Sequence, residues 1–170
     1  MKIRKAVLSD VPGIAKVHVD SWRTTYTNII PDDYIQKLSY EKREQLWNGV
    51  IPKGNVFVAE NDAGKIVGFS DGGAERSGKY KEFDGELNSI YILQEYQGLG
   101  IGTLLVKSVV NELKKLGMKS MIVIVLENNS SRLFYDRLGG KKIDTLEIEF
   151  AGKKLKELVY GWKDIHTLFP

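Results

Sequence analysis

The sequence predicts a mixed α/β sheet, and three observations carry this prediction. Two short apolar segments flank Asn61-Asp62-Ala63-Gly64, which has the residues of a tight turn and indicates an antiparallel strand pair. A strand, a glycine-rich loop, an amphipathic helix and an unbroken apolar strand then follow one another within residues 86–126. The chain closes with two more strands around a turn at Ala151-Gly152.

The N-terminal part is expected to hold one strand and several helical segments. Met1 to Ala6 is predicted to be a short strand. Ser9 or Asp10 can cap a helix that carries Pro12 in its first turn and extends to Trp22 or beyond. Two shorter helical segments follow a break at Pro31, over residues 32–38 and 40–47.

The rest of the chain combines strands with two helices. A helix over residues 100–116 places Leu105, Val109 and Leu113 on one face and ends at Gly117. A short helix over residues 130–138 stops at Gly139-Gly140, and residues 72–85 are expected to be a loop or irregular strand. The expected strands cover residues 55–60, 65–72, 86–93, 119–126, 141–150 and 154–162. No linker or repeat interrupts this order, so one domain over residues 1–170 is expected.

Composition excludes several classes of protein. There is no cysteine, which rules out disulfides and thiolate nucleophiles, and the two histidines, His18 and His166, are too far apart in sequence to indicate a metal site. The formal charge is +3 with lysines and arginines scattered, so no nucleic-acid partner is expected. No signal peptide or apolar run of about 18 residues is present, so no membrane contact is expected and the cytoplasm is the expected location.

The segment Gln97-Gly98-Leu99-Gly100-Ile101-Gly102 places three glycines directly before the long helix. The first N–H groups of a helix have no partner within it, and a missing side chain lets a phosphate approach the backbone. The spacing matches neither a Walker loop, which needs a following Lys-Ser or Lys-Thr, nor a dinucleotide loop, whose last glycine comes one residue later. A plain glycine-rich turn and a site for another nucleotide both stay open on these residues alone.

Three motifs in the same order resemble the GCN5-related N-acetyltransferases, the GNAT family. The glycine segment resembles the family's Q/R-x-x-G-x-G/A signature, and ELNSIYIL before it resembles the central strand. NNSSRLFYDRLGG, residues 128–140, resembles N-x-x-A-x-x-F-Y-x-x-x-G-F, with Ser131 replacing the usual alanine and Gly140 the usual phenylalanine. The resemblance covers most of the chain. It implies an acyl-CoA N-acyltransferase fold, in which helices flank a central, mostly antiparallel sheet.

The resemblance also implies acetyl-CoA (coenzyme A) as the cofactor. Its pyrophosphate is expected on the N–H groups from Gln97 to Thr103, and its pantetheine arm beside the central strand, which the family splays from the next one. There an N–H group would polarise the thioester carbonyl. Asn128 is expected to hold the arm by its amide, and Arg132 stays open between a phosphate contact and a solvated charge. The expected cofactor contacts are Ile90, Tyr91, Ile92, Gln97, Gly98, Leu99, Gly100, Ile101, Gly102, Thr103, Asn128, Ser131 and Tyr135.

The implied chemistry needs a base and an acid. An alkyl ammonium of pKa about 10 loses a proton before it attacks, and the departing thiolate gains one. Tyr135 matches the family's general acid, and Glu86 is the expected base, directly or through a water. A carboxylate with an ordinary pKa of about 4 is a poor base, so Glu86 would need burial or a water relay. Each residue also has a purely structural interpretation: Tyr135 as a packed aromatic beside Phe134, and Glu86 as a surface glutamate at a strand end. The lack of cysteine favours direct attack in a ternary complex.

The acceptor is the part that the residues specify least. Trp22 and Tyr26 are expected to contact it, although packing of an amphipathic helix also explains Trp22, and His18 can be a core histidine. The residues do not distinguish a small-molecule amine from a peptide amine. The alternative to an active N-acetyltransferase is a catalytically silent acyl-CoA-binding regulatory module. The final strands and the apolar end IHTLFP are expected to allow a homodimer.

Overall fold

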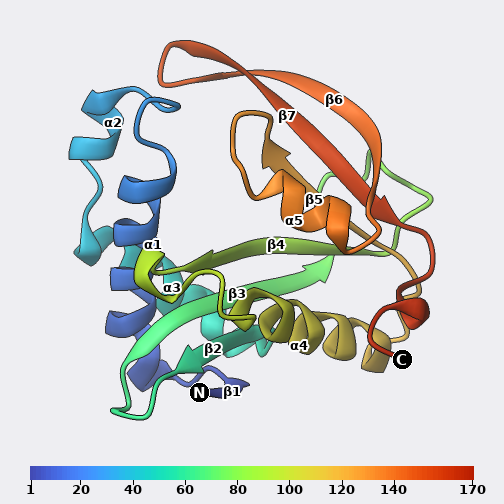
Figure 1. The fold of residues 1–170 in the computed structure, drawn as a ribbon, viewed down its shortest axis with the longest axis horizontal. Helices are drawn as coiled ribbons and strands as arrows, with labels where there is room; N and C mark the ends of the chain where they lie inside the picture. The colour runs from blue at the N-terminus through green and yellow to red at the C-terminus, as the bar shows by residue number, and fades with distance from the viewer.

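A computed structural model describes residues 1–170, and one seven-stranded sheet runs through it (Figure 1). The strand order is β1-β2-β3-β4-β5-β7-β6, and every neighbouring pair is antiparallel except β4 with β5. The predicted mixed α/β fold with a mostly antiparallel sheet is therefore confirmed. The strands are β1 (Lys2–Lys5), β2 (Val56–Glu60), β3 (Ile66–Ala74), β4 (Gly85–Ile92), β5 (Met121–Leu126), β6 (Lys141–Phe150) and β7 (Lys153–Trp162).

Helices cover both faces of this sheet. Gly68 of β3 lies against Leu105 of one helix, whereas the next residue, Phe69, contacts His18 of another. Successive residues of a strand point to opposite faces, so these two helices, α4 and α1, lie on opposite sides. None of the helices is long and apolar enough to cross a membrane. The α-helices are α1 (Val11–Thr25), α2 (Asp32–Gln36), α3 (Tyr40–Val50), α4 (Ile101–Lys115) and α5 (Arg132–Arg137).

The main core extends over both faces of the sheet and includes buried side chains of α1, α3 and α4. The predicted apolar face of α4 is confirmed, since Leu105, Val109 and Leu113 are at most 1% exposed and belong to one cluster of buried side chains. Leu116 follows the last helical residue, and Gly117 then adopts a φ of 81°, a left-handed conformation that suits a glycine beyond a helix end. This packing holds α4 against the sheet and places its N-terminus beside the end of β4.

The start of α1 differs from the sequence expectation. Asp10, one of the two expected residues, occupies the N-cap position, but no side-chain hydrogen bond from it reaches the first turn of the helix. The Asp10 carboxylate instead accepts two bonds from Arg4, of 2.7 and 2.8 Å, and one from the Val7 N–H of 2.8 Å. The carboxylate thus ties the start of α1 to β1, which a helix-capping rule based on neighbouring residues does not anticipate.

The C-terminal segment corrects a second expectation. The end IHTLFP is not a free apolar patch, because Ile165 is fully buried and Leu168 and Phe169 pack against the main core. The strand at this side of the sheet, β6, is a true edge, and its exposed residues include Lys142 and Glu147. Charged side chains on an edge strand oppose pairing with a second sheet. The homodimer therefore stays a prediction that now depends on the edge strand alone.

Candidate active site

A gap opens between β4 and β5 in the middle of the sheet. The two strands are paired only where residues 85–87 lie beside residues 121–123. Asn88 follows as an extra residue in β4, since Leu87 pairs with Gly72 and Ser89 pairs with Asp71 of β3. Such a bulge bends the strand that carries it. Beyond it β4 continues beside β3 while β5 continues beside β7, and the edge of β4 that faces β5 is left open.

The open edge of β4 has free backbone donors. Leu93, directly after β4, donates its N–H to the Val67 carbonyl across β3. Because N–H directions alternate along an extended strand, the N–H groups of Ile92 and Ile90 point the other way, into the gap. An extended chain placed there can pair with β4 as an extra strand.

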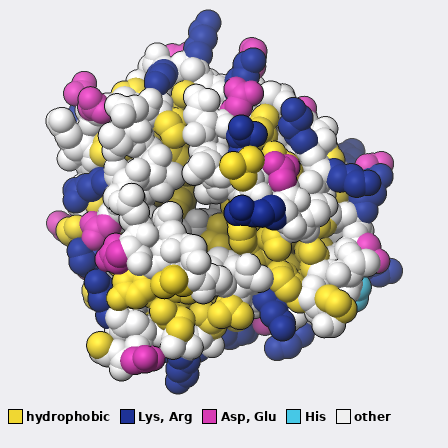
Figure 2. All heavy atoms as spheres, in the orientation of Figure 1, with side chains coloured by type: hydrophobic (Ala, Val, Ile, Leu, Met, Phe, Trp, Pro, Cys, Tyr) yellow, Lys and Arg dark blue, Asp and Glu magenta, His cyan; other side chains and the backbone are white.

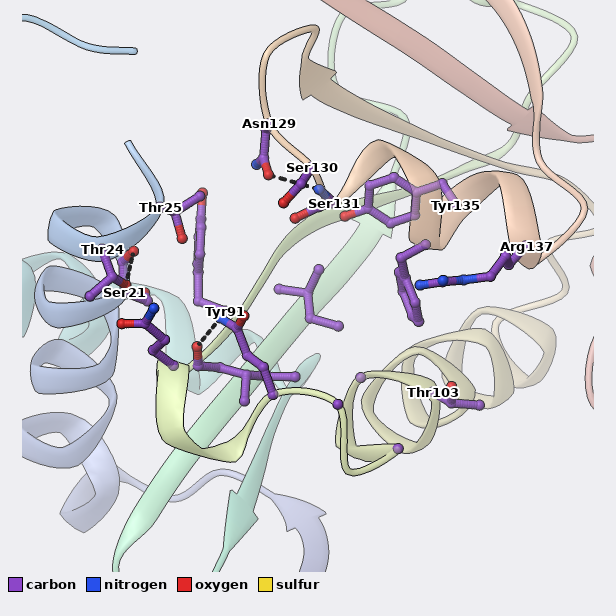
Figure 3. A pocket seen from close by; sticks show the side chains of 18 of the residues that line it. Ser21, Thr24, Thr25, Tyr91, Thr103, Asn129, Ser130, Ser131, Tyr135 and Arg137 are labelled. Carbon is purple, nitrogen blue, oxygen red and sulfur yellow. Dashed lines mark hydrogen bonds between the residues drawn. The ribbon is translucent and has the colours of Figure 1, made fainter. Parts of the chain in front are cut away.

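A cavity of about 700 Å³ follows this gap to the start of α4. Figure 2 shows the same face hollowed near its centre, and Figure 3 shows the side chains around the hollow. One wall comes from α1, the floor from β4 and the glycine loop, and the far wall from α5 and the loop before it. The lining residues are Ser21, Thr24, Thr25, Ile90, Tyr91, Ile92, Gln94, Gln97, Gly98, Gly100, Gly102, Thr103, Asn129, Ser130, Ser131, Phe134, Tyr135, Arg137 and Leu138.

The glycine loop presents a run of unpaired donors. None of the backbone N–H groups from Gly98 to Thr103 donates a hydrogen bond within the protein, whereas the Gln97 N–H already bonds to the Gln94 carbonyl at 3.1 Å. Gly98 and Gly100 have φ angles of 75° and 80°, which only glycine adopts without strain. Free N–H groups at the start of α4, together with the helix dipole, suit a phosphate or pyrophosphate.

The third glycine of the loop, Gly102, lines the cavity where α5 meets the first turn of α4. A Cβ atom on Gly102 would lie 3.4 Å from the Phe134 ring and 3.5 Å from the Ile92 side chain, which are ordinary van der Waals contacts. Two other loop residues contribute backbone only, since the Leu99 side chain is 67% exposed and Ile101 is buried in the core. The side chains of Leu99 and Ile101 do not line the cavity.

Tyr135 of α5 lies at the cavity wall with its ring buried among aromatic side chains. The ring is 5.5 Å from that of Phe134 and 6.2 Å from that of Tyr160, centre to centre. Its hydroxyl has no protein partner and points into the cavity in Figure 3. Burial, with a smaller contribution from Tyr91, raises the pKa of this phenol above its usual value of 10. It is therefore held in the protonated form, as a proton donor must be.

The two predicted acceptor contacts lie behind the cavity wall. The Tyr26 hydroxyl is 3.2 Å from that of Tyr91, which does line the cavity, and the Trp22 ring packs 4.7 Å from the Tyr26 ring. The indole N–H of Trp22 is buried without an acceptor. The side chains of α1 that reach the cavity are hydroxyls, at Ser21, Thr24 and Thr25. Their spacing of three and four residues places them on one helix face, and this spacing was the feature of the sequence from which a polar wall could have been predicted.

The loop before α5 places its two asparagines differently. Asn129 is buried, lines the cavity and accepts the Ser131 N–H at 2.9 Å through its side-chain oxygen. Asn128 instead lines a second cavity, beside the β6–β7 hairpin. Nothing in the motif separates two adjacent asparagines, because the direction of each depends on the turn that joins β5 to α5. The structure therefore brings Asn129, and not the expected Asn128, to the site.

The basic side chain in the cavity wall is Arg137, which the sequence did not single out, and not Arg132, whose role it left open. Phe134, Arg137 and Leu138 all line it, and their spacing of three and four residues places them on one face of α5. Arg137 is thus the cation available to an anionic ligand here.

Glu86, the expected base, is buried but lies outside the cavity. Its carboxylate accepts a 2.8 Å bond from the Arg76 guanidinium and a 3.0 Å bond from the Arg76 backbone N–H. The side chain is 2% exposed. The assignment of Glu86 as the base stays a prediction, and both of its carboxylate oxygens are already engaged by Arg76.

Comparisons with known proteins agree with this geometry. A sequence model described as the Acetyltransferase (GNAT) family matches residues 19–140. The chain is 43% identical over 166 residues to a Bacillus subtilis (strain 168) protein named uncharacterized N-acetyltransferase YuaI, covering 98% of this chain and 95% of that one. It is 27% identical over 164 residues to spermidine N(1)-acetyltransferase of Thermoplasma acidophilum, covering 92% and 98% of the two chains.

A solved structure has the same fold. It is described as the PaiA N-acetyltransferase of Thermoplasma acidophilum in complex with coenzyme A. It superposes with a TM-score of 0.73 over 92% of this chain and 96% of that chain, at 24% sequence identity.

Proposed function

Because this chain belongs to the GNAT family of acetyltransferases, we propose that it transfers the acetyl group of acetyl-CoA directly to a primary amine. The observation that supports this most is the continuity of one cavity. It begins at the unpaired N–H groups from Gly98 to Thr103, follows the open edge of β4, and passes the Tyr135 hydroxyl. A diphosphate, an extended amide arm and a thioester come in this order in acetyl-CoA.

Each part of the cavity fits one part of the donor. The N–H groups of the glycine loop and the guanidinium of Arg137 would hold the phosphates. The N–H groups of Ile90 and Ile92 would pair with the amide arm and, near Ile90, polarise the thioester carbonyl. The Asn129 amide lies on the opposite side of the same passage. Acetyl-CoA supplies the activated acetyl group, and the protein supplies position and protons.

Tyr135 is proposed to protonate the departing thiolate. Its hydroxyl faces the cavity without a protein partner, and its raised pKa keeps the proton in place until a thiolate needs it. Direct attack by the amine is the simplest route, since the chain has no cysteine to carry an acetyl group. The sulfur would then lie beside α5, and the carbonyl beside β4.

The acceptor is proposed to be a primary amine on a small molecule or a peptide. The relative named for spermidine supports a small-molecule amine as the first candidate. No Asp or Glu side chain lines the cavity, and its α1 wall consists of hydroxyls. A polycation therefore finds no carboxylate partner within this cavity, which favours amines with a neutral polar body.

The test is thiol release from acetyl-CoA with a panel of amines: spermidine, L-lysine, an alanyl dipeptide, an aminoglycoside and a lysine-containing peptide. The protein gives no background to the thiol reagent, because it has no cysteine. Release that depends on one amine class supports the proposal and identifies the acceptor. Tight acetyl-CoA binding with no release from any amine contradicts it and supports a silent acyl-CoA-binding module instead.

A homodimer through the β6 edge remains part of the proposal. Light scattering at micromolar concentrations tests it, and a monomer mass throughout the range would contradict it.

A further inference from the structure

Asp71 of β3 is a buried carboxylate that the proposed mechanism has not yet used. It is 8% exposed. One oxygen accepts a short hydrogen bond from the Ser89 hydroxyl, and the other accepts a 3.1 Å bond from the Asn88 amide. The side-chain oxygen of Asn88 is itself buried and has no donor. Three polar side chains therefore meet at the bulge where β4 leaves β5.

This cluster faces the side of the sheet opposite α4. Phe69 contacts His18 of α1, and Asp71, two residues further along β3, points to the same face. Ser89 pairs with Asp71 as Tyr91 pairs with Phe69, and paired residues share a face. Ser89 thus lies about 7 Å along β4 from Tyr91, which lines the cavity. Asp71, Asn88 and Ser89 do not line the cavity themselves, and the half-buried Ser89 is next to it through Ile90, which does. The backbone of Ile90, where the thioester carbonyl is proposed to bind, lies between Ser89 and Tyr91.

The charged groups near Asp71 are Arg76 and Glu86, and the Asp71 charge contributes to raising the pKa of Tyr91. Burial raises the pKa of the Asp71 carboxyl, while the bonds from Ser89 and Asn88 and the charge of Arg76 oppose the rise. Arg76 gives its own hydrogen bonds to Glu86 and none to Asp71. Of the three buried carboxylates, Asp10, Asp71 and Glu86, Asp71 is the one without an ion pair to an arginine.

We propose, on the basis of the acetyltransferase function above, that Asp71 accepts the proton of the incoming ammonium through the Ser89 hydroxyl. Ser89 takes a proton from the ammonium nitrogen as it passes its own to Asp71, so that a neutral amine and a neutral carboxyl result.

The proton and bond changes balance in this scheme. The amine nitrogen bonds to the acetyl carbon, the carbon–sulfur bond breaks, and the thiolate takes the Tyr135 proton. The phenolate regains a proton from the nitrogen, which becomes a neutral amide. Asp71 then releases its proton to water, so that one proton leaves for each ammonium acetylated.

The test compares the pH dependence of kcat/KM in wild type and variants, with the fastest amine of the panel above. For Asp71→Asn the expected rate at pH 7 falls about 100-fold or more, the usual size of a lost general base. In this variant, the pH below which kcat/KM falls is expected to rise to the pKa of the amine itself, about 10, because only the free amine then reacts. Ser89→Ala is expected to show the same change in the pH dependence of kcat/KM. Ser89→Thr keeps a hydroxyl and is expected to retain the wild-type pH dependence on the acid side.

The controls separate a relay from a packing effect. Asp62→Asn removes an exposed turn carboxylate and is expected to leave the profile unchanged. Each variant is expected to bind CoA as the wild type does. An Asp71→Asn enzyme that keeps the wild-type pH dependence on the acid side and loses less than about 3-fold in rate overturns the proposal. So does a Glu86→Gln enzyme that loses this pH dependence while Asp71→Asn keeps it.

A second measurement does not need an acceptor, so it separates this inference from the proposed function. Carbon-13 labelling of aspartate carboxyls, with Asp71→Asn to identify the signal, gives the Asp71 pKa directly. A value above the ordinary 3.9 that rises further in Ser89→Ala supports the relay, since the hydroxyl bond stabilises the carboxylate. A value at or below 3.9 overturns it, whatever amine the enzyme acetylates.

Discussion

The indole N–H of Trp47 donates a 3.0 Å hydrogen bond to Nδ1 of His18, and both side chains are buried. Because Nδ1 accepts this bond, the neutral imidazole carries its proton on Nε2. The ring also stacks on Tyr91, with 5.4 Å between centres. His18 therefore supports a residue of the cavity wall from behind. It is a core histidine and not a titrating group of the site.

The His18 environment predicts acid sensitivity. Burial, with a smaller effect of Arg43, lowers the pKa of His18 to about 3. Below pH 6.5 the unfolded chain binds a proton at this ring and the folded protein does not, so stability falls as the pH drops towards 3. Between pH 6.5 and 5 the expected loss is about 2 kcal/mol. Urea unfolding of the wild type and of His18→Asn at both pH values isolates the contribution of His18 to this loss, since the other groups titrate alike in the two proteins. Equal losses in the two proteins would refute the assignment.

Removal of one hydroxyl tests the proposed acid. Tyr135→Phe is expected to bind CoA normally and to lower kcat about 100-fold or more, because only the proton donor is lost. Tyr160→Phe, a neighbouring aromatic on β7, is the matched control and is expected to keep near-normal kcat. Since the pKa of Tyr135 is raised, the wild-type kcat should not fall on the alkaline side until above about pH 10. A Tyr135→Phe enzyme with wild-type turnover would exclude the role.

Substitutions at two glycines with the same backbone conformation distinguish the effect of backbone strain from the effect of lost ligand contact. Gly100 and Gly64 have φ angles of 80° and 79°, and a Cβ would meet nothing within 4 Å at either. Valine at either position is expected to cost about 1–2 kcal/mol of stability. Only Gly100→Val should also weaken CoA binding, by about 10-fold or more, because its side chain would stand where the pyrophosphate approaches. Calorimetric titration with CoA measures this, and equal affinities of the two variants would contradict the loop assignment.

A second glycine pair tests the packing beneath β3. A Cβ on Gly72 would lie 2.5 Å from Val109 of α4 and 2.9 Å from the Glu86 carbonyl oxygen, whereas one on Gly49 of α3 would meet nothing within 4 Å. Gly72→Ala is expected to lose about 1–3 kcal/mol of stability through overpacking. Gly49→Ala is expected to gain about 0.4–1 kcal/mol, because alanine loses less freedom in a helix. Urea unfolding compares the stabilities of the two variants. A Gly72→Ala protein as stable as the wild type would contradict the prediction and show that α4 can shift to make room for the added methyl group.

Much of the fold was predictable because its signals are local. Apolar periodicity located α4 and its buried face, and turn residues located the β2–β3 and β6–β7 pairs. The glycine segment predicted free backbone donors at a helix start, and the structure has them from Gly98 to Thr103. The strand that carries Ile90 was likewise predictable, and the unpaired edge on which it lies matches the splay that the family resemblance implied.

The parts that sequence patterns missed depend on contacts between distant residues. The turn between β5 and α5 decides whether the side chain of Asn128 or that of Asn129 enters the cavity. Asn129 lines this cavity, and Asn128 lines a different one. Glu86 could be recognised as a candidate base, but its pairing with Arg76 across a ten-residue separation could not be anticipated. The same holds for the meeting of Asp71 with Ser89, which a bulge in β4 brings about.

The sequence by itself thus determined the order of the elements, the family and the glycine loop with its free backbone donors, since each is written in contiguous residues. Only the tertiary structure decided which carboxylate is paired and which is free, which asparagine and arginine face the cavity, and which face of α1 forms its wall. The physical reason is that burial and hydrogen-bond partners are properties of the packed chain. They set the proton affinity of Asp71 and Tyr135, and no local pattern encodes them.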